Sequence, residues 1–189
     1  GLNALLLGSV LWAGWTHAED PISVYRAEWD TWHKARLECL TAADGFLSLA
    51  GLYWLVEGET RFGAAGDNDI VFPDPAPAHI GVFTLAAGQV SLEVKTGVEV
   101  FREDPEKGQT PVRALGFPDL ADADSAPLAV GSQRFYPIER SGRYGIRLKD
   151  PHSETRLHFR GIEHFAPDPA WRIEGRFAPK SRTIPVHSI

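Results

Sequence analysis

The chain has 189 residues, 43% of them hydrophobic and 11% aromatic, which fits one folded domain with a sizeable core. A formal net charge of −6, with no basic run, argues against a nucleic-acid partner. The single cysteine, Cys39, excludes an internal disulfide. Its place in a helical pattern predicts a small buried side chain.

The first element is an apolar segment over residues 1–18 without a formally charged side chain. As a helix it would reach about 27 Å, just short of a hydrocarbon core, and we interpret it as a membrane anchor. The alternative is a secretory signal that is cleaved after Ala18. The acidic flank, Glu19 and Asp20, indicates that the bulk of the chain lies on the periplasmic or extracytoplasmic side. The side chains expected to meet lipid or a partner are Leu5, Leu6, Leu7, Val10, Leu11, Trp12 and Trp15.

An amphipathic helix is predicted next, over residues 20–43. Asp20 has the character of an N-cap, and Pro21 suits the first helical position because its missing N–H has no partner there anyway. Apolar residues recur at steps near three and four; they are Ile22, Tyr25, Trp29, Trp32, Leu37 and Leu40. The face with Trp29 and Trp32 requires a covering surface, either the chain's own sheet or another protein.

Residues 45–189 change to a pattern of short strands. About nine strands separated by turns predict a mainly β domain, a β-sandwich or barrel. Tight hairpins are expected at 86–89 and 141–142. The near-continuous apolar run at 52–55 predicts a buried strand, and the alternation over 172–177 predicts a strand with one exposed face. Residues 103–127 are rich in Pro, Gly, Asp and Ala and are expected to form a loop.

Several motifs in order resemble the DUF1684 family of uncharacterised proteins. They are Phe46-Leu47-Ser48-Leu49-Ala50-Gly51-Leu52-Tyr53-Trp54-Leu55, Phe62-Gly63, Asn68-Asp69-Ile70-Val71, Arg143-Tyr144-Gly145-Ile146-Arg147, Asp150-Pro151, Phe165-Ala166-Pro167-Asp168-Pro169 and Thr183-Ile184-Pro185-Val186. The resemblance covers roughly residues 25–186. It implies an architecture and an extracytoplasmic context, but no activity.

A fainter resemblance is to forkhead-associated (FHA) domains, which are phosphothreonine-binding β-sandwiches. It rests on Phe62-Gly63 and Asn68-Asp69-Ile70-Val71, and it implies an FHA-like sandwich. Phosphate capture in that family needs an Arg after the Gly and a Ser-Arg before a His, whereas Ala64 and Ala78-His79 stand here. The guanidinium fork is missing, so the sequence argues against a phosphopeptide ligand. We expect Asn68 and Asp69 to brace the turn instead.

No reactive constellation is found in the sequence. There is no Gly-x-Ser-x-Gly elbow, no phosphate-cradling loop and no CxxC. His158 and His164 stand six apart, which is not the spacing of a zinc pair. Carboxylates are plentiful, but spacing alone does not select a catalytic pair. We therefore predict no catalytic residue, no metal site and no cofactor.

These observations predict a non-catalytic accessory subunit. An N-terminal anchor and helix would hold one FHA-like β-sandwich on the extracytoplasmic side of a membrane. Residues 1–40 would contact lipid and an integral-membrane complex, with a respiratory or photosynthetic complex as one candidate. The alternative is a secreted ligand-binding or hydrolytic module with a cleavable signal peptide.

Overall fold

The computed structural model describes residues 20–120, 123 and 126–179. The chain divides into two compact units. Among the described residues, one unit lies within 35–162, and the other consists of 20–34 together with 163–179. The predicted anchor, residues 1–18, lies outside the described residues, as do Leu5, Leu6, Leu7, Val10, Leu11, Trp12 and Trp15. Among the helices that are described, none is both long enough and apolar enough to cross a membrane.

Helix α1 (Pro21–Thr41) begins where the sequence predicts it. The Asp20 carboxylate accepts a hydrogen bond from the Ile22 N–H at 3.3 Å, and the Asp20 carbonyl accepts one from Val24 at 3.1 Å. None of its residues is fully buried. The half-buried side chains form a stripe at steps of three and four, namely Tyr25, Trp29, His33, Leu37 and Leu40.

Eleven strands lie in the described part of the chain, after a short 3-10 turn, η1 (Phe46–Ser48). They are β1 (Leu49–Trp54), β2 (Gly58–Gly63), β3 (Ile70–Val71), β4 (Gly81–Ala86), β5 (Gln89–Val94), β6 (Val100–Asp104), β7 (Gly108–Val112), β8 (Ala114–Phe117), β9 (Leu128–Val130), β10 (Gln133–Arg140) and β11 (Arg143–Lys149). A short helix, α2 (Glu154–Leu157), and a 3-10 turn, η2 (Pro169–Trp171), follow.

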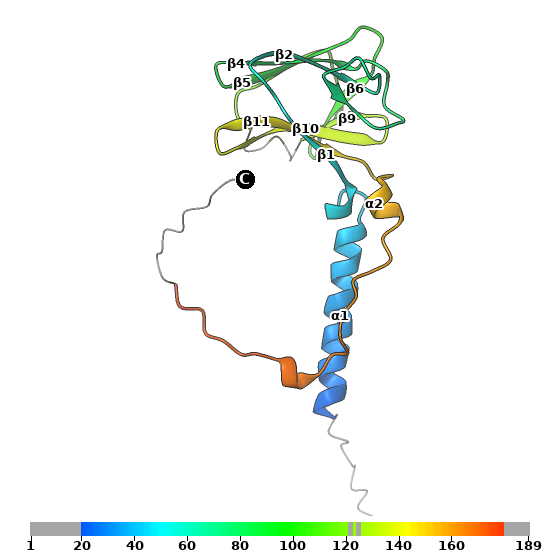
Figure 1. Ribbon diagram of the computed structural model, residues 1–189, viewed down its shortest axis with the longest axis vertical. Helices are drawn as coiled ribbons and strands as arrows, with labels where there is room; N and C mark the ends of the chain where they lie inside the picture. Colours follow the sequence, from blue (N-terminus) through cyan, green and yellow to red (C-terminus); the bar gives the residue numbers. More distant parts are fainter. Residues whose placement is uncertain (1–19, 121–122, 124–125, 180–189) are drawn as a thin grey trace, which may run out of the picture. The chain divides into compact units, whose positions relative to one another are not determined.

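The strands form two sheets that pack face to face as a β-sandwich (Figure 1). The six-stranded sheet has the order β1-β11-β10-β9-β6-β7, and the five-stranded sheet has the order β3-β2-β4-β5-β8. Neighbouring strands are antiparallel except β2 and β3, which are parallel. The mainly β architecture expected from the sequence is therefore present.

The core between the sheets is aromatic. Phe62, Phe83 and Phe135 are fully buried, and Phe72 is almost so. The Phe62 ring lies 4.6 Å from Phe83 and 5.5 Å from Phe135 between centroids, in tilted and edge-on arrangements that aromatic pairs favour. Rings from both sheets meet in this cluster and fix how the sheets stack.

Both predicted hairpins are confirmed. Ala87 and Gly88 have φ of 50° and 77° between β4 and β5, and Ser141 and Gly142 have φ of 52° and 76° between β10 and β11. Positive φ at both central residues gives the turn whose twist matches the flanking strands.

Two local predictions are wrong. Residues 103–127 are not a continuous loop, because β7 and β8 lie within them. Residues 172–177 form no strand, because no neighbouring strand in the described chain hydrogen-bonds to them, and alternation alone does not make a sheet.

Candidate functional site

An aromatic cluster organises the unit that contains the first part of α1. Trp29 stacks on His33 one turn later, with ring centroids 4.5 Å apart and an interplanar angle of 17°. His164 comes from the far end of the chain and lies 4.3 Å from Trp29 and 4.9 Å from His33. Trp29 is thus placed where the sequence predicts a covered face, whereas Trp32 is 58% exposed.

The segment that follows His164 exposes large apolar side chains to an unusual degree. Phe165 is 94% exposed, Trp171 77%, Ile173 92% and Phe177 88%. Between Asp168 and Trp171 the chain turns through η2, where Pro169 starts the turn and the Asp168 carboxylate caps the Ala170 N–H at 2.8 Å. We call residues 163–179 the apolar strap.

A groove of about 450 Å³ lies between the apolar strap and the first turns of α1. Tyr25 and Trp29 form one wall, and the strap from Phe165 to Asp168 with Trp171 forms the other. Of the four exposed apolar side chains, Phe165 and Trp171 line this groove, whereas Ile173 and Phe177 lie further along the strap.

Cys39 does not fit the prediction made for it. The side chain is exposed rather than buried, although it lies in α1 as expected. The half-buried stripe of α1 passes through Leu37 and Leu40, on either side of Cys39, and leaves the thiol in solvent.

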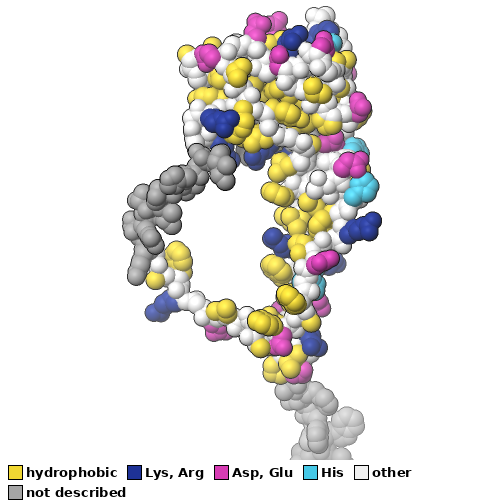
Figure 2. Space-filling view, viewed as in Figure 1, with side chains coloured by type: hydrophobic (Ala, Val, Ile, Leu, Met, Phe, Trp, Pro, Cys, Tyr) yellow, Lys and Arg dark blue, Asp and Glu magenta, His cyan; other side chains and the backbone are white. Residues whose placement is uncertain are grey.

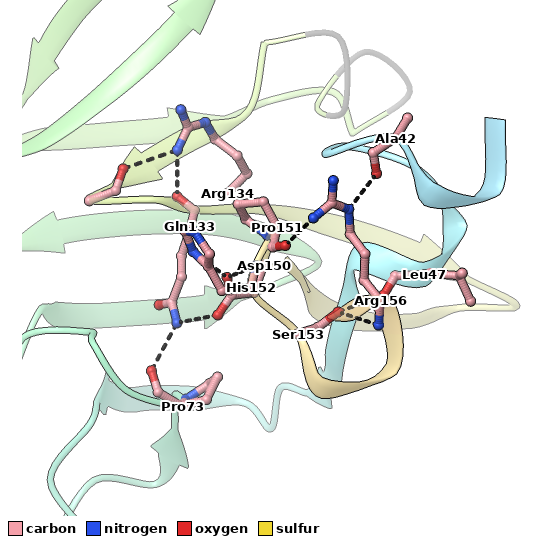
Figure 3. A network of polar contacts seen from close by, with 11 residues as sticks. Ala42, Leu47, Pro73, Gln133, Arg134, Asp150, Pro151, His152, Ser153 and Arg156 are labelled. Carbon is pink, nitrogen blue, oxygen red and sulfur yellow. Dashed lines mark hydrogen bonds and ion pairs between the residues drawn. The ribbon is translucent and has the colours of Figure 1, made fainter. Parts of the chain in front are cut away.

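A polar network ties the sandwich to the end of α1 (Figure 3). Asp150 is 3% exposed, and its carboxylate accepts hydrogen bonds from the Gln133 amide at 3.2 Å and the His152 N–H at 2.8 Å. The Arg156 guanidinium donates to the carbonyls of Thr41 and Ala42, at 2.8 and 3.2 Å. These contacts pair the buried Asp150 carboxylate and the open carbonyls at the end of α1, whereas the buried Gln133 Oε1 has no hydrogen-bond partner.

The turn that resembles FHA domains is braced as expected. The Asn68 amide donates to the carbonyls of Ala65 and Ala78, both at 2.8 Å. The Asp69 carboxylate accepts from the Arg61 N–H at 2.8 Å and from its guanidinium at 3.2 Å, and these two bonds lower the pKa of Asp69. Arg61 is therefore engaged with Asp69 and holds the turn.

His158 and His164, the pair that stands six apart in the sequence, do not form a common site. His158 hydrogen-bonds to Glu154 in the sandwich unit, and His164 lies in the aromatic cluster of the other unit. Within residues 20–120, 123 and 126–179, no three His, Cys, Asp or Glu side chains gather as a metal site would require.

The comparisons with known proteins add little. No family model and no curated protein matches the chain, so the resemblance to DUF1684 stays a prediction. Among solved structures, the FHA domain of FhaA, crystallised with the intracellular domain of another protein, matches with a TM-score of 0.34 and 15% identity. The match covers 52% of this chain and 97% of that domain. A TM-score this low says nothing about function.

The exposure of the apolar strap is a feature that sequence reasoning missed. Ile173 and Phe177 belong to the alternation over 172–177 that predicts a strand, so the sequence gives no signal that they stay exposed.

Proposed function

We propose that this chain is a non-catalytic accessory subunit that stabilises a larger membrane complex by burying apolar surface against it. The observation that carries the proposal is the exposure of four large apolar side chains, Phe165, Trp171, Ile173 and Phe177, in one short segment. Scattered apolar residues are normal on a protein surface, but a run of this kind calls for a partner.

The size of the surface supports a protein partner. Aromatic side chains bury on the order of 150–250 Å² each, so Phe165, Trp171 and Phe177 together would bury roughly 600 Å², and Ile173 would add to this area. That is close to one partner's share of a standard protein interface, which is about 800 Å². The groove beside Tyr25 and Trp29 would receive an apolar side chain of the partner.

The membrane part of the proposal rests on the sequence. Residues 1–18 would tether the chain in lipid or against transmembrane helices, with the β-sandwich on the periplasmic or extracytoplasmic side. α1 follows this segment after only two residues, so a tether at residues 1–18 would bring α1 close to the same membrane.

The test is extraction of the native protein in a gentle detergent, followed by size-exclusion chromatography and mass spectrometry. We expect the chain to elute with integral-membrane proteins in fixed ratio, and its intact mass to include Leu2 to Ala18. Recovery as a lone soluble monomer that starts at Glu19 would contradict the proposal and favour the secreted module.

A further inference from the structure

One face of the six-stranded sheet gathers cations. Along β11, Tyr144, Ile146 and Leu148 point into the core of the sandwich. Because side chains alternate along a strand, Arg143, Arg147 and Lys149 share the opposite, outer face.

The register of the β10–β11 hairpin adds a further charge to this face. Arg140 pairs with Arg143, and Tyr136 pairs with Arg147. Two like charges directly opposite each other on neighbouring strands destabilise a sheet. The arrangement therefore calls for a compensating anion.

Among the described residues, backbone carbonyls meet two of these cations. The Lys149 ammonium donates to the Asp44 carbonyl at 3.2 Å, and the Arg140 guanidinium donates to the Glu139 carbonyl at 3.4 Å. In the part of the chain that the structure describes, no carboxylate lies within ion-pair distance of Arg140, Arg143, Arg147 or Lys149. A cavity of about 380 Å³ is lined by Arg140 and Arg147, and two carboxylates, Asp119 and Glu139, also line it. Glu139 accepts a hydrogen bond from the Gly142 N–H at 3.0 Å, and so it is engaged in the turn.

Apolar side chains border the cations on the neighbouring strand. β1 is an edge strand, and alternate residues along it and just past it are exposed: Leu52 by 41%, Trp54 by 36% and Val56 by 68%. The sequence predicts a buried strand at 52–55, and this prediction is wrong for the outer face of β1, where Leu52 and Trp54 are exposed. Arg143 lies over the Trp54 ring, 4.1 Å from its centroid.

We propose that this surface binds anionic phospholipid headgroups at a bilayer surface; we call it the basic face, and it consists of Leu52, Trp54, Val56, Arg140, Arg143, Arg147 and Lys149. In Figure 2, dark blue side chains gather along the lower margin of the sandwich, where Figure 1 places β10 and β11. The cations meet lipid phosphates, and the apolar row enters the headgroup layer beside them.

The chemistry of the face favours lipid over nucleic acid. Leu52 and Val56 are aliphatic and offer no ring on which a base can stack, and the Trp54 ring is covered by Arg143. The net charge of −6 also repels a long polyanion, whereas a flat anionic surface touches one face only.

The test is vesicle co-sedimentation of the full chain. Vesicles of phosphatidylcholine alone are compared with vesicles that contain about a quarter of phosphatidylglycerol, at about 0.1 M salt. Residues 1–18 carry no formal charge and should contribute equally to the binding of both kinds of vesicle. The ratio of the two affinities therefore measures the contribution of the basic face. We expect a strong preference for the anionic vesicles, because each cation near such a surface contributes roughly fivefold.

The variant Arg140→Gln/Arg143→Gln/Arg147→Gln should lose about a hundredfold of that preference. The control variant, Lys95→Gln/Lys107→Gln/Arg160→Gln, removes the same charge from exposed positions outside the basic face. It should keep the preference for anionic vesicles. Three results would each overturn the proposal. The chain could bind both kinds of vesicle equally, or both variants could lose the anionic preference to the same extent. The third result is tighter binding to a duplex oligonucleotide than to anionic vesicles. The accessory role concerns a protein partner of the apolar strap, so either proposal can fail alone.

Discussion

Replacing Arg156 with Ala should loosen the junction between α1 and the sandwich. The guanidinium donates through Nε to Thr41 and Ala42 and through a terminal nitrogen to Pro151 at 2.7 Å. Nε is shared between two carbonyls, so the side chain makes about two strong bonds, each of about 1.5–3 kcal/mol because the donor is charged. Arg156 is half-buried, so in the variant water will hydrogen-bond to part of the exposed carbonyls and reduce the loss. We expect the free energy of unfolding to fall by about 2–4 kcal/mol.

The assay for this prediction is urea unfolding followed by circular dichroism. Arg156→Lys keeps the charge but not the planar fork and should recover part of the loss. Arg160→Ala, at a nearby exposed arginine, is the control and should change stability by less than about 0.5 kcal/mol. A similarly small change for Arg156→Ala would refute the role assigned to this side chain.

Three further predictions concern the core, the turn and the aromatic cluster. Phe135→Ala, which empties the centre of the ring cluster, should cost about 3–5 kcal/mol in urea unfolding, and a cost under about 1 kcal/mol would contradict the packing. The Arg61 N–H and guanidinium lower the pKa of Asp69 below its usual 3.8. The Asp69 carboxylate therefore contributes its full stabilisation of the fold above pH 3.8, and this contribution is lost as the pH falls through the lowered pKa. Asp69→Asn should therefore lose less stability than the wild type between about pH 5 and pH 2, and an equal loss would count against this account. Trp29→Ala should shift the ring-proton resonances of His164 in the NMR spectrum, because the indole ring lies 4.3 Å from the imidazole, and unchanged shifts would show that the ring contact does not form.

Local chemistry explains which parts of the fold could be predicted. The two hairpins are set by their own turn residues, and the start of α1 by Asp20 and Pro21, so short-range signals suffice. β7 was missed because Pro111 and Gly108 read as loop residues, although Pro is tolerated on an edge strand such as this one.

The two proposed surfaces depend on information that the sequence does not carry. Trp29 could be singled out, but its partner His164 is brought to it only by the fold. The opposition of Arg140 and Arg143 follows once the hairpin register is known, but their shared face requires knowing which side is the core. An apolar run such as 52–55 does not tell whether a strand is covered on one face or two.

The variant Phe165→Ser/Ile173→Ser/Phe177→Ser tests the docking role of the apolar strap most directly. These side chains are 88–94% exposed, so the variant should fold with unchanged stability. The control, Phe46→Ser/Val71→Ser/Leu157→Ser, removes exposed apolar side chains from the other unit.

The deciding measurement is the ratio of integral-membrane partner to this chain after purification in gentle detergent. We predict that the strap variant loses the partner and that the control keeps it at the wild-type ratio. Retention of the partner by a folded strap variant would contradict the claim that this chain works by burying the apolar strap.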